Sequence, residues 1–236
     1  MAAERLDHYI VVEDPASLAA DSLAKAAKAG GQIALAGGST PRGAYERLAG
    51  MSIDWPGCTL WFGDERCVPP NDLRSNFRMV REALLDRLTN AAPDVRRIAG
   101  ECEPGVAAEA YERDLRAAFG DDLPRLDLVL LGLGPDAHCA SLFPGQPSLD
   151  ERERLAVGIE RPGLEPWVPR VTLTLPVINA AREVVFLVAG ADKADAVERA
   201  FGGEPSRDAP ASLVAPENGV LTVLLDQAAA TQLPPA

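Results

Sequence analysis

The chain has 236 residues, of which 47% are hydrophobic and 25% are charged, enough to build one sizeable α/β core. Its formal net charge of −12 excludes generic binding to nucleic acid or to anionic membranes, because both require a positive surface field. No window approaches the roughly 20 apolar residues that a membrane span requires. We therefore expect a soluble, cytoplasmic protein that forms a single α/β domain over residues 1–236.

Cysteine and histidine are sparse, and their spacing argues against a metal site. The four cysteines show neither a CxxC pair nor an ordered pattern with histidine, and they are Cys58, Cys67, Cys102 and Cys139. The only two histidines, His8 and His138, lie far apart in the sequence. We expect free thiols and no bound metal.

The first half of the chain alternates strand and helix patterns. We expect strands over 8–13, 32–36 and 58–65, and helices over 15–30, 41–50 and the segment that follows Ser75. Pro15 suits the first turn of its helix, and a glycine pair ends that helix. Ser75 is a predicted N-cap. The apolar residues of the last helix recur three or four apart, at Phe77, Val80, Leu84 and Leu88.

The second half continues the same alternation. We expect helices over 105–119 and 192–201, and strands over 126–134, 154–160, 170–175, 183–190 and 219–226. The run "LDLVLLGLG" is apolar throughout, which is typical of a parallel strand covered on both faces. Alternating strands and helices predict a doubly wound, mostly parallel, Rossmann-like sheet with helices on both faces. A small β-containing subregion is expected around 150–180. In such sheets, ligands bind beyond the carboxyl ends of the strands.

The stretch "LAGGSTPRGAY" places a glycine-rich turn between a buried strand and a helix. Gly37 and Gly38 allow close approach of the backbone to a ligand, Ser39 and Thr40 supply hydroxyls, and Pro41 begins a helix whose free N–H groups favour an anion. The turn contains neither the GxxxxGK[ST] loop nor the GxGxxG fingerprint. A phosphate site and an ordinary strand-to-helix turn both fit this pattern.

The stretch "WFGDERCVPPNDLRSN" places three charges beyond a second strand. Arg66 can clamp a phosphate or carboxylate through two parallel hydrogen bonds, and the neighbouring acids Asp64 and Glu65 can hold it in place. The alternative is a solvated charged loop.

The stretch "LGLGPDAHCASLFPG" carries His138 just beyond the most apolar strand. Imidazole changes charge near neutral pH, so His138 is a candidate general base for activating a water, with Asp136 beside it. A purely structural histidine is the alternative. A triad with Ser141 is discounted, because residues this close on one loop seldom converge and no G-x-S-x-G elbow occurs. His8 lacks a glycine-rich loop and is interpreted as structural.

Two further cations are candidates for an anion site. Lys193 begins a predicted helix, where the helix dipole disfavours a cation unless a local anion is present; solvent exposure is the alternative. Arg170 stands at the beginning of its predicted strand and is a weaker candidate.

These motifs, in this order, resemble those of the 6-phosphogluconolactonase family over nearly the whole chain. The matching blocks include "LAGGSTPRGAYERLA", "WFGDERCVPPNDLRSNFRMVREALL" and "LDLVLLGLGPDAHCASLFPG". The resemblance implies hydrolysis of the δ-lactone of 6-phosphogluconate in the pentose phosphate pathway, without metal or cofactor. It implies that His138 is the general base beside Asp136. It also implies that Ser39, Thr40, Arg66 and Lys193 bind the substrate phosphate and that Arg170 lies on the substrate side. We expect Gly38 and Asp64 to contribute to substrate binding as well.

The chain departs from the family at the histidine loop. Where the family commonly reads D-G-H-T-A-S, this chain reads "DAHCAS". If the family glycine has a positive φ, Ala137 is strained by about 1 kcal/mol or more. Cys139 removes a hydroxyl. The oxyanion donors cannot be assigned from sequence; backbone N–H groups of residues 134–138 are one candidate.

Two alternative functions remain. A glucosamine-6-phosphate deaminase-like isomerase shares the implied fold but reads "DGHIAFNEPG" at the histidine loop, and this chain lacks the Asn-Glu pair. A non-catalytic sugar-phosphate-binding protein of the repressor-effector type adds a basic DNA-binding segment, whereas this chain is acidic. We expect a small-molecule substrate, no nucleic-acid or membrane partner, and a monomer or small homo-oligomer.

Overall fold

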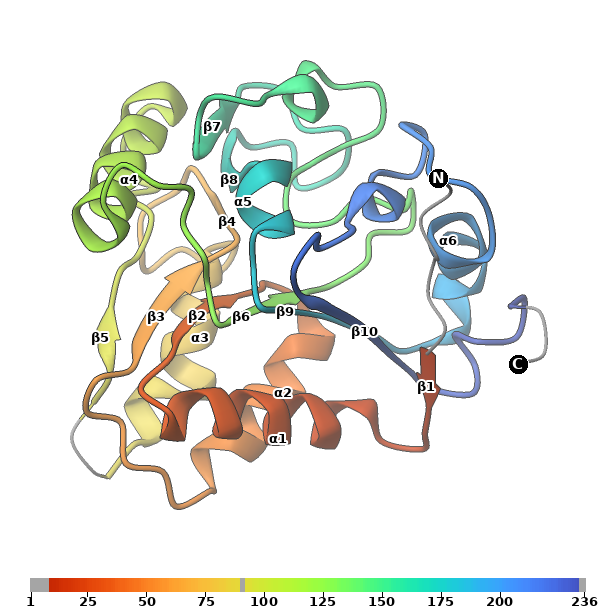
Figure 1. Cartoon of the computed structure of the whole chain (residues 1–236), viewed down its shortest axis with the longest axis horizontal. Coiled ribbons are helices and arrows are strands. Elements are labelled where there is room, and N and C mark those ends of the chain that lie inside the picture. The colour runs from red at the N-terminus through yellow and green to blue at the C-terminus, as the bar shows by residue number, and fades with distance from the viewer. Residues whose placement is uncertain (1–8, 90–91, 234–236) are drawn as a thin grey trace.

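The computed structural model describes residues 9–89 and 92–233, and the strands within these ranges form two sheets (Figure 1). The larger sheet has seven strands, all paired in parallel. Its order is β1 (Tyr9–Val11), β10 (Val220–Leu225), β9 (Glu183–Val188), β6 (Leu128–Leu131), β2 (Gln32–Leu35), β3 (Thr59–Phe62) and β5 (Asp94–Val95). The predicted doubly wound parallel sheet is confirmed.

Helices lie on both faces of this sheet (Figure 1). One face carries α1 (Pro15–Lys28), α2 (Ser39–Ala49) and α3 (Asn76–Ala83), and the other carries α4 (Pro104–Phe119) and α5 (Leu175–Asn179). The predicted cap of α3 is present, since the Ser75 hydroxyl accepts a hydrogen bond from the Arg78 N–H at 3.1 Å. Short 3₁₀ turns are present at Leu85–Arg87, Pro147–Asp150, Ala191–Lys193 and Pro210–Leu213.

The chain reverses its direction of winding at β2, which lies between β3 and β6. From β2 it proceeds to β3 and β5 on one side, and it later returns to β6 on the other side. The loops that follow β2 and β6 therefore diverge at the carboxyl ends of adjacent strands. A doubly wound sheet opens its ligand crevice at such a point.

The smaller sheet corrects the predicted strand assignment. The single strand expected over 58–65 is divided at Gly63 into β3 and β4 (Asp64–Arg66). Gly63 joins the two sheets, because its N–H donates to Leu35 and its carbonyl accepts from Leu173. β4 pairs antiparallel with β8 (Arg170–Leu173), which pairs antiparallel with β7 (Ala156–Ile159). The strands expected over 154–160 and 170–175 thus lie outside the parallel sheet.

Two further differences concern one helix and one short strand. The helix expected over 192–201 is a composite: the 3₁₀ turn Ala191–Lys193 leads into α6 (Ala194–Val197) and then into a π-helical turn, Glu198–Gly202. β5 was not predicted, because its two residues carry no alternation that a sequence pattern can detect. His8 lies outside the described residues, so its structural interpretation remains a prediction.

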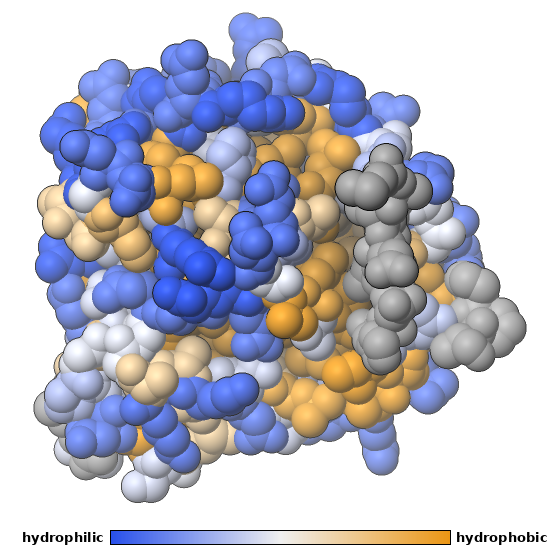
Figure 2. Space-filling model, in the orientation of Figure 1, coloured by the Kyte–Doolittle hydropathy of each residue, from blue (hydrophilic) through white to orange (hydrophobic). Residues whose placement is uncertain are grey.

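Apolar side chains fill the space between the layers, and the largest fully buried ones include Trp61, Tyr45 and Tyr111. Figure 2 shows polar residues over most of the left side of one face and hydrophobic residues right of centre, in the area of β10. The exposed Val220 belongs to that strand. Among the described helices, none is long and apolar enough to cross a membrane.

The four thiols lie in different environments, which predicts selective labelling. Cys58 and Cys139 are buried and Cys102 is exposed. Burial raises the pKa of Cys139 to about 12, with the charge of Asp64 adding to the shift, and thiols react as thiolates. We expect iodoacetamide to label Cys102 first in the native protein and all four thiols after denaturation, as measured by peptide mass spectrometry. Native labelling of Cys139 as fast as that of Cys102 would contradict the buried placement.

Candidate functional site

A cavity of about 250 Å³ lies beyond the carboxyl ends of β9, β6, β2 and β3, which are neighbours in the sheet. Its lining includes Gly38, Ser39, Thr40, Asp64, Arg66, His138, Arg170 and Lys193. Asp136, which does not line the cavity, contacts His138 directly. The residues that the sequence singled out, from segments far apart in the chain, are therefore brought together around one cavity.

The turn after β2 has the features of an anion cradle. Gly38 occupies a positive φ of 107° and is followed at Ser39 by the first residue of α2. The first N–H groups of a helix have no partner within it, and they carry the positive end of the helix dipole. Gly37 is required for packing, because a Cβ there would lie 1.9 Å from Oδ1 of Asn76. The turn thus presents free N–H groups and two hydroxyls to the cavity.

Arg66 reaches the cavity. The sequence predicts that the neighbouring acids hold its guanidinium, but in the structure they do not. Its Nη1 donates to the carbonyl of Arg74 at 2.7 Å. The Glu65 carboxylate instead accepts hydrogen bonds from the N–H groups of Arg66, Asn76 and Phe77. Glu65 is buried and anchors the beginning of α3. The Arg66 guanidinium is positioned by a backbone carbonyl instead of a carboxylate.

Asp64 connects the cradle to the histidine loop. One carboxylate oxygen accepts from the Ser141 hydroxyl at 2.6 Å, and the other accepts from the Asn76 side-chain amide at 3.0 Å. Ser141 is fully buried and is bonded to Asp64, not to His138. The geometry therefore supports the rejection of a Ser-His-Asp triad.

His138 and Asp136 form a close pair at the end of β6. Nδ1 of His138 lies 2.5 Å from Oδ1 of Asp136. Burial alone would raise the pKa of Asp136, but its hydrogen bond and charge interaction with His138 lower the pKa below the usual value. An ionised carboxylate on Nδ1 keeps the proton there and leaves Nε2 as the acceptor. In this tautomer the imidazole can accept a proton at Nε2.

Glycine at position 134 makes room for this imidazole. A Cβ on Gly134 would lie 2.0 Å from Nδ1 and 2.1 Å from Cε1 of His138. Real Cβ atoms do not approach other atoms so closely. The glycine in "LGLGPDAH" is therefore a steric requirement of the histidine position.

The loop backbone shows the strain expected at its unusual alanine. Ala137 has φ = 62°, a left-handed conformation that costs a residue with a Cβ about 1–2 kcal/mol. The alanine is fully buried, and its carbonyl accepts from the N–H of Ala211. Burial and this hydrogen bond hold the strained conformation in place.

Three backbone N–H groups of this loop are occupied, which argues against those three as oxyanion donors. The N–H of Gly134 donates to the His138 carbonyl, and that of Ala137 donates to the Gly134 carbonyl. The N–H of His138 donates to Asp136 Oδ1, and Pro135 has no N–H. Stabilisation of an oxyanion by these three amides would require their loop hydrogen bonds to break.

Arg170 lies at the cavity, although its place at the beginning of a strand made it a weaker candidate. Because β8 is antiparallel to β4, its first residue pairs with Arg66 at the site. Arg170 is 3% exposed, and burial lowers the pKa of its guanidinium. In a parallel strand, the first residue would lie at the opposite edge of the sheet from the site. The sequence pattern predicts that arrangement, and Arg170 is therefore a weaker candidate on sequence grounds.

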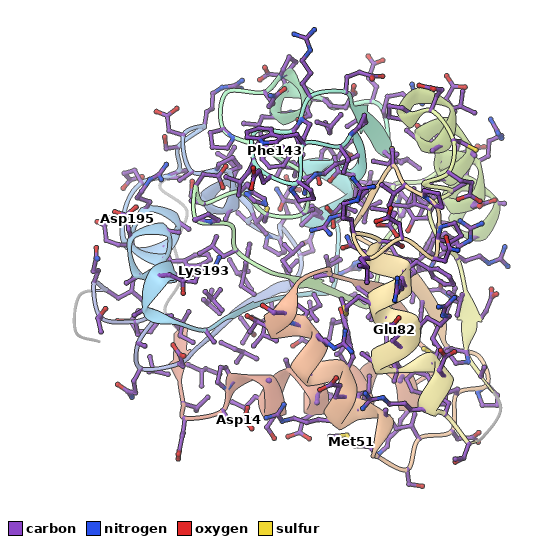
Figure 3. All side chains as sticks on the ribbon, turned by 180° about the vertical axis from the view of Figure 1, so that it is seen from behind. Asp14, Met51, Glu82, Phe143, Lys193 and Asp195 are labelled. Atoms are coloured by element: carbon purple, nitrogen blue, oxygen red, sulfur yellow. The ribbon has the colours of Figure 1, made fainter. Side chains whose placement is uncertain are left out.

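Lys193 reaches the cavity from the segment after β9. Its side chain is 22% exposed, and its ammonium lies 4.0 Å from the exposed carboxylate of Asp192. Figure 3 places Lys193 beside the α6 segment and Phe143 among the loops above the sheet. The cations of the site therefore come from β4, β8 and the start of the α6 segment.

Sequence reasoning missed two residues that support the site. The ring of Phe143 contacts both the His138 imidazole, at 4.6 Å between ring centroids, and the Arg170 guanidinium, whose Cζ is 5.2 Å from the Phe143 ring centroid. Asn76 holds Asp64 and fills the space beside Gly37. Asn76 could be suspected only from its place after the Ser75 cap, and Phe143 only from its place in the histidine motif.

The fold and cavity define a class of α/β proteins with a composite small-molecule site, and solved structures share this architecture. The 6-phosphogluconolactonase from Trypanosoma cruzi superposes with a TM-score of 0.87 at 28% identity, covering 100% of this chain and 99% of that one. The enzyme of that name from Trypanosoma brucei gives 0.86 at 28% identity over 98% and 100%. A monomeric glucosamine-6-phosphate deaminase, at 22% identity and a TM-score of 0.79, shares the fold.

Sequence comparison identifies the family. Residues 10–223 match the family described as "Glucosamine-6-phosphate isomerases/6-phosphogluconolactonase", and the chain belongs to it. The 6-phosphogluconolactonase of Nostoc sp. is 41% identical and matches over 85% of this chain and 84% of its own length. The human 6-phosphogluconolactonase is 44% identical over 74% and 68%.

Proposed function

We propose that this protein hydrolyses 6-phospho-D-glucono-1,5-lactone to 6-phospho-D-gluconate, the lactonase step of the pentose phosphate pathway. The protein is a carboxylic ester hydrolase that acts on a sugar-phosphate lactone. The observation that carries the proposal is the placement of a carboxylate-paired imidazole and an anion cradle on one cavity. The names of the relatives at about 40% identity support this reaction.

The phosphate binds at the turn after β2. The hydroxyls of Ser39 and Thr40 and the free N–H groups of α2 contact its oxygens, while Arg66 and Lys193 supply positive charge. These cations are needed because the chain as a whole, with a net charge of −12, repels an anionic substrate. Binding at this turn places the lactone ring toward His138.

His138 acts as the general base. Nε2 takes a proton from a water as the water oxygen attacks the lactone carbonyl carbon, and the carbonyl π electrons move to oxygen. The tetrahedral oxyanion then reforms the C=O bond and expels the ring oxygen, which receives the proton from His138. General base catalysis contributes on the order of 10²–10⁴-fold in rate, and Asp136 holds the imidazole in the required tautomer.

The Arg66→Ala variant tests the phosphate grip. A charge-assisted hydrogen bond contributes about 1.5–3 kcal/mol, so we expect KM to rise by roughly 10- to 100-fold with a smaller change in kcat. The measurement is steady-state hydrolysis of freshly generated lactone, corrected for the uncatalysed rate. Arg182→Ala is the matched control, because Arg182 pairs with Asp127 on the exposed surface and does not line the cavity. An unchanged KM in Arg66→Ala would contradict the grip.

Other features of this proposal rest on sequence composition. The acidic charge supports a protein without nucleic-acid or membrane partners, and we propose a cytoplasmic location and a monomer or small homo-oligomer. The described residues contain no group of three or more His, Cys, Asp or Glu side chains placed to hold a metal. Catalysis without a metal or cofactor remains a prediction. The loop "DAHCASLFPG" lacks the Asn-Glu pair of the deaminase motif, and this difference argues against the deaminase alternative.

A further inference from the structure

The proposed reaction creates a negative charge, and three backbone N–H groups of the histidine loop have no capacity left to stabilise it. When water attacks the lactone, charge develops on the carbonyl oxygen, and enzymes stabilise such charge with preorganised hydrogen-bond donors. The N–H groups of Gly134, Ala137 and His138 already donate within the loop. A cavity-lining side chain with an unused donor can take their place.

Arg170 has donor capacity that the protein does not use. Its Nη2 donates to the carbonyls of Leu164 at 3.1 Å and of Pro166 at 3.3 Å. Its Nε, although buried, has no acceptor among the described residues. A buried donor without an acceptor costs about 1–3 kcal/mol. Arg170 lines the cavity, so a molecule bound there could supply the missing acceptor and remove this cost.

The surroundings of Arg170 place it at the imidazole end of the cavity. The Phe143 ring contacts both the Arg170 guanidinium and the His138 imidazole. Because one fully buried ring touches both groups, they are fixed relative to each other. Arg66 likewise has a buried Nε without an acceptor among the described residues, but its Nη1 donates to the carbonyl of Arg74, in the loop before α3. The two arginines, paired across β4 and β8, therefore have different neighbours.

We propose that the Arg170 guanidinium is a catalytic group that stabilises the oxyanion formed on the lactone carbonyl when water, activated by His138, attacks it. This inference rests on the proposed lactonase function. Arg170 is preorganised for this role, because two backbone carbonyls and an aromatic ring hold its guanidinium before substrate binds. Its charge is near that of Asp136, the partner of His138.

The test separates the oxyanion role from phosphate binding. Removing one oxyanion donor lowers kcat by about 10²–10³-fold, so we expect that loss in Arg170→Ala. Binding of sorbitol 6-phosphate, which has the phosphate and no carbonyl, should change by less than about threefold, measured by calorimetry. Arg66→Ala should weaken that binding. Millimolar guanidinium should raise kcat of Arg170→Ala by supplying the missing donor.

Two further variants control for structural damage. Arg154→Ala removes an arginine that binds Glu112 at 2.6 Å beside the small sheet and does not line the cavity; its kcat should stay at the wild-type level, with no response to guanidinium. Arg170→Lys keeps the charge without the planar fork, and its kcat should still fall at least tenfold. This second variant serves if Arg170→Ala does not fold.

Several results would overturn the inference. One is a kcat of Arg170→Ala within threefold of wild type while the wild-type protein hydrolyses the lactone, which leaves the lactonase function intact. Another is an unchanged kcat with at least tenfold weaker binding of sorbitol 6-phosphate, which makes Arg170 a phosphate ligand. A loss of kcat in Arg154→Ala equal to that in Arg170→Ala would show that disturbance of the small sheet, and not removal of an oxyanion donor, lowers the rate. A wild-type protein without lactonase activity overturns both proposals.

Discussion

The His138→Ala variant is expected to lose at least about 100-fold in kcat, the lower bound for general base catalysis, while KM stays close to that of the wild type. The loss follows because no other imidazole lines the cavity in the part of the chain that the structure describes. KM is retained because the phosphate cradle belongs to the turn after β2 and to β4, not to the histidine loop. The measurement is a pH-stat assay with freshly generated lactone.

The chain offers a matched control for this experiment, since it has only one other histidine. His8→Ala removes that imidazole and is expected to keep wild-type kcat. Thermal denaturation of both variants verifies that they fold. Equal turnover in His138→Ala and the wild type would remove His138 from the mechanism.

The Gly134→Ala variant is expected to lose about 100-fold in kcat, the scale of a 1 Å misplacement of a reacting group. The new Cβ would lie 2.0 Å from His138 Nδ1 and 2.8 Å from Asp136 Oδ1. Either the imidazole or the loop must move, and both movements break the alignment of the His138–Asp136 pair. Steady-state kinetics measures the effect.

Gly132→Ala provides the control on the same loop. Gly132 also lines the cavity, but a Cβ there has its nearest neighbour 4.0 Å away, at the carbonyl of Gly37. We expect its kcat to stay within about threefold of wild type, an effect of about 0.6 kcal/mol or less on the barrier. Similar losses in both glycine variants would show that the loop as a whole, and not the space for the imidazole, limits activity.

The parallel sheet and most of the cavity could be predicted from sequence because local patterns determine them. A fully apolar strand, proline at a helix start and glycine at a helix end each have a local physical cause. Parallel strands that end at one edge bring their following loops together. For that reason the turn at Ser39 and the loop at His138, about a hundred residues apart, could be placed at one crevice.

The small sheet could not be predicted from the same patterns. Nothing local in "WFGDER" indicates that the chain changes sheets at Gly63, since the decisive hydrogen bonds join this residue to Leu35 and Leu173. Because β8 pairs antiparallel with β4, its first residue faces the site, whereas a parallel strand would present its last residue there. The position of Arg170 at the cavity therefore depends on tertiary pairing that its own sequence neighbourhood does not encode.

The side-chain network around the site was also beyond local reasoning. Glu65 was expected to hold Arg66, whereas its carboxylate satisfies three backbone N–H groups and the Ser75 hydroxyl. A buried carboxylate must accept hydrogen bonds from nearby donors that have no other partner. For Glu65 these donors include N–H groups at the beginning of α3, so they are known only from the packed structure. By contrast, the strain at Ala137 followed from comparing one residue with the family pattern.

The most direct test of the account compares two substrates of the wild-type protein. We expect hydrolysis of 6-phosphoglucono-δ-lactone well above the spontaneous rate, with kcat/KM at least about 100-fold higher than for unphosphorylated glucono-δ-lactone, because two or more charge-assisted phosphate contacts contribute about 3 kcal/mol or more. Equal kcat/KM for the two lactones, or no hydrolysis above the spontaneous rate, would contradict the claim that the cradle and the imidazole act on one substrate.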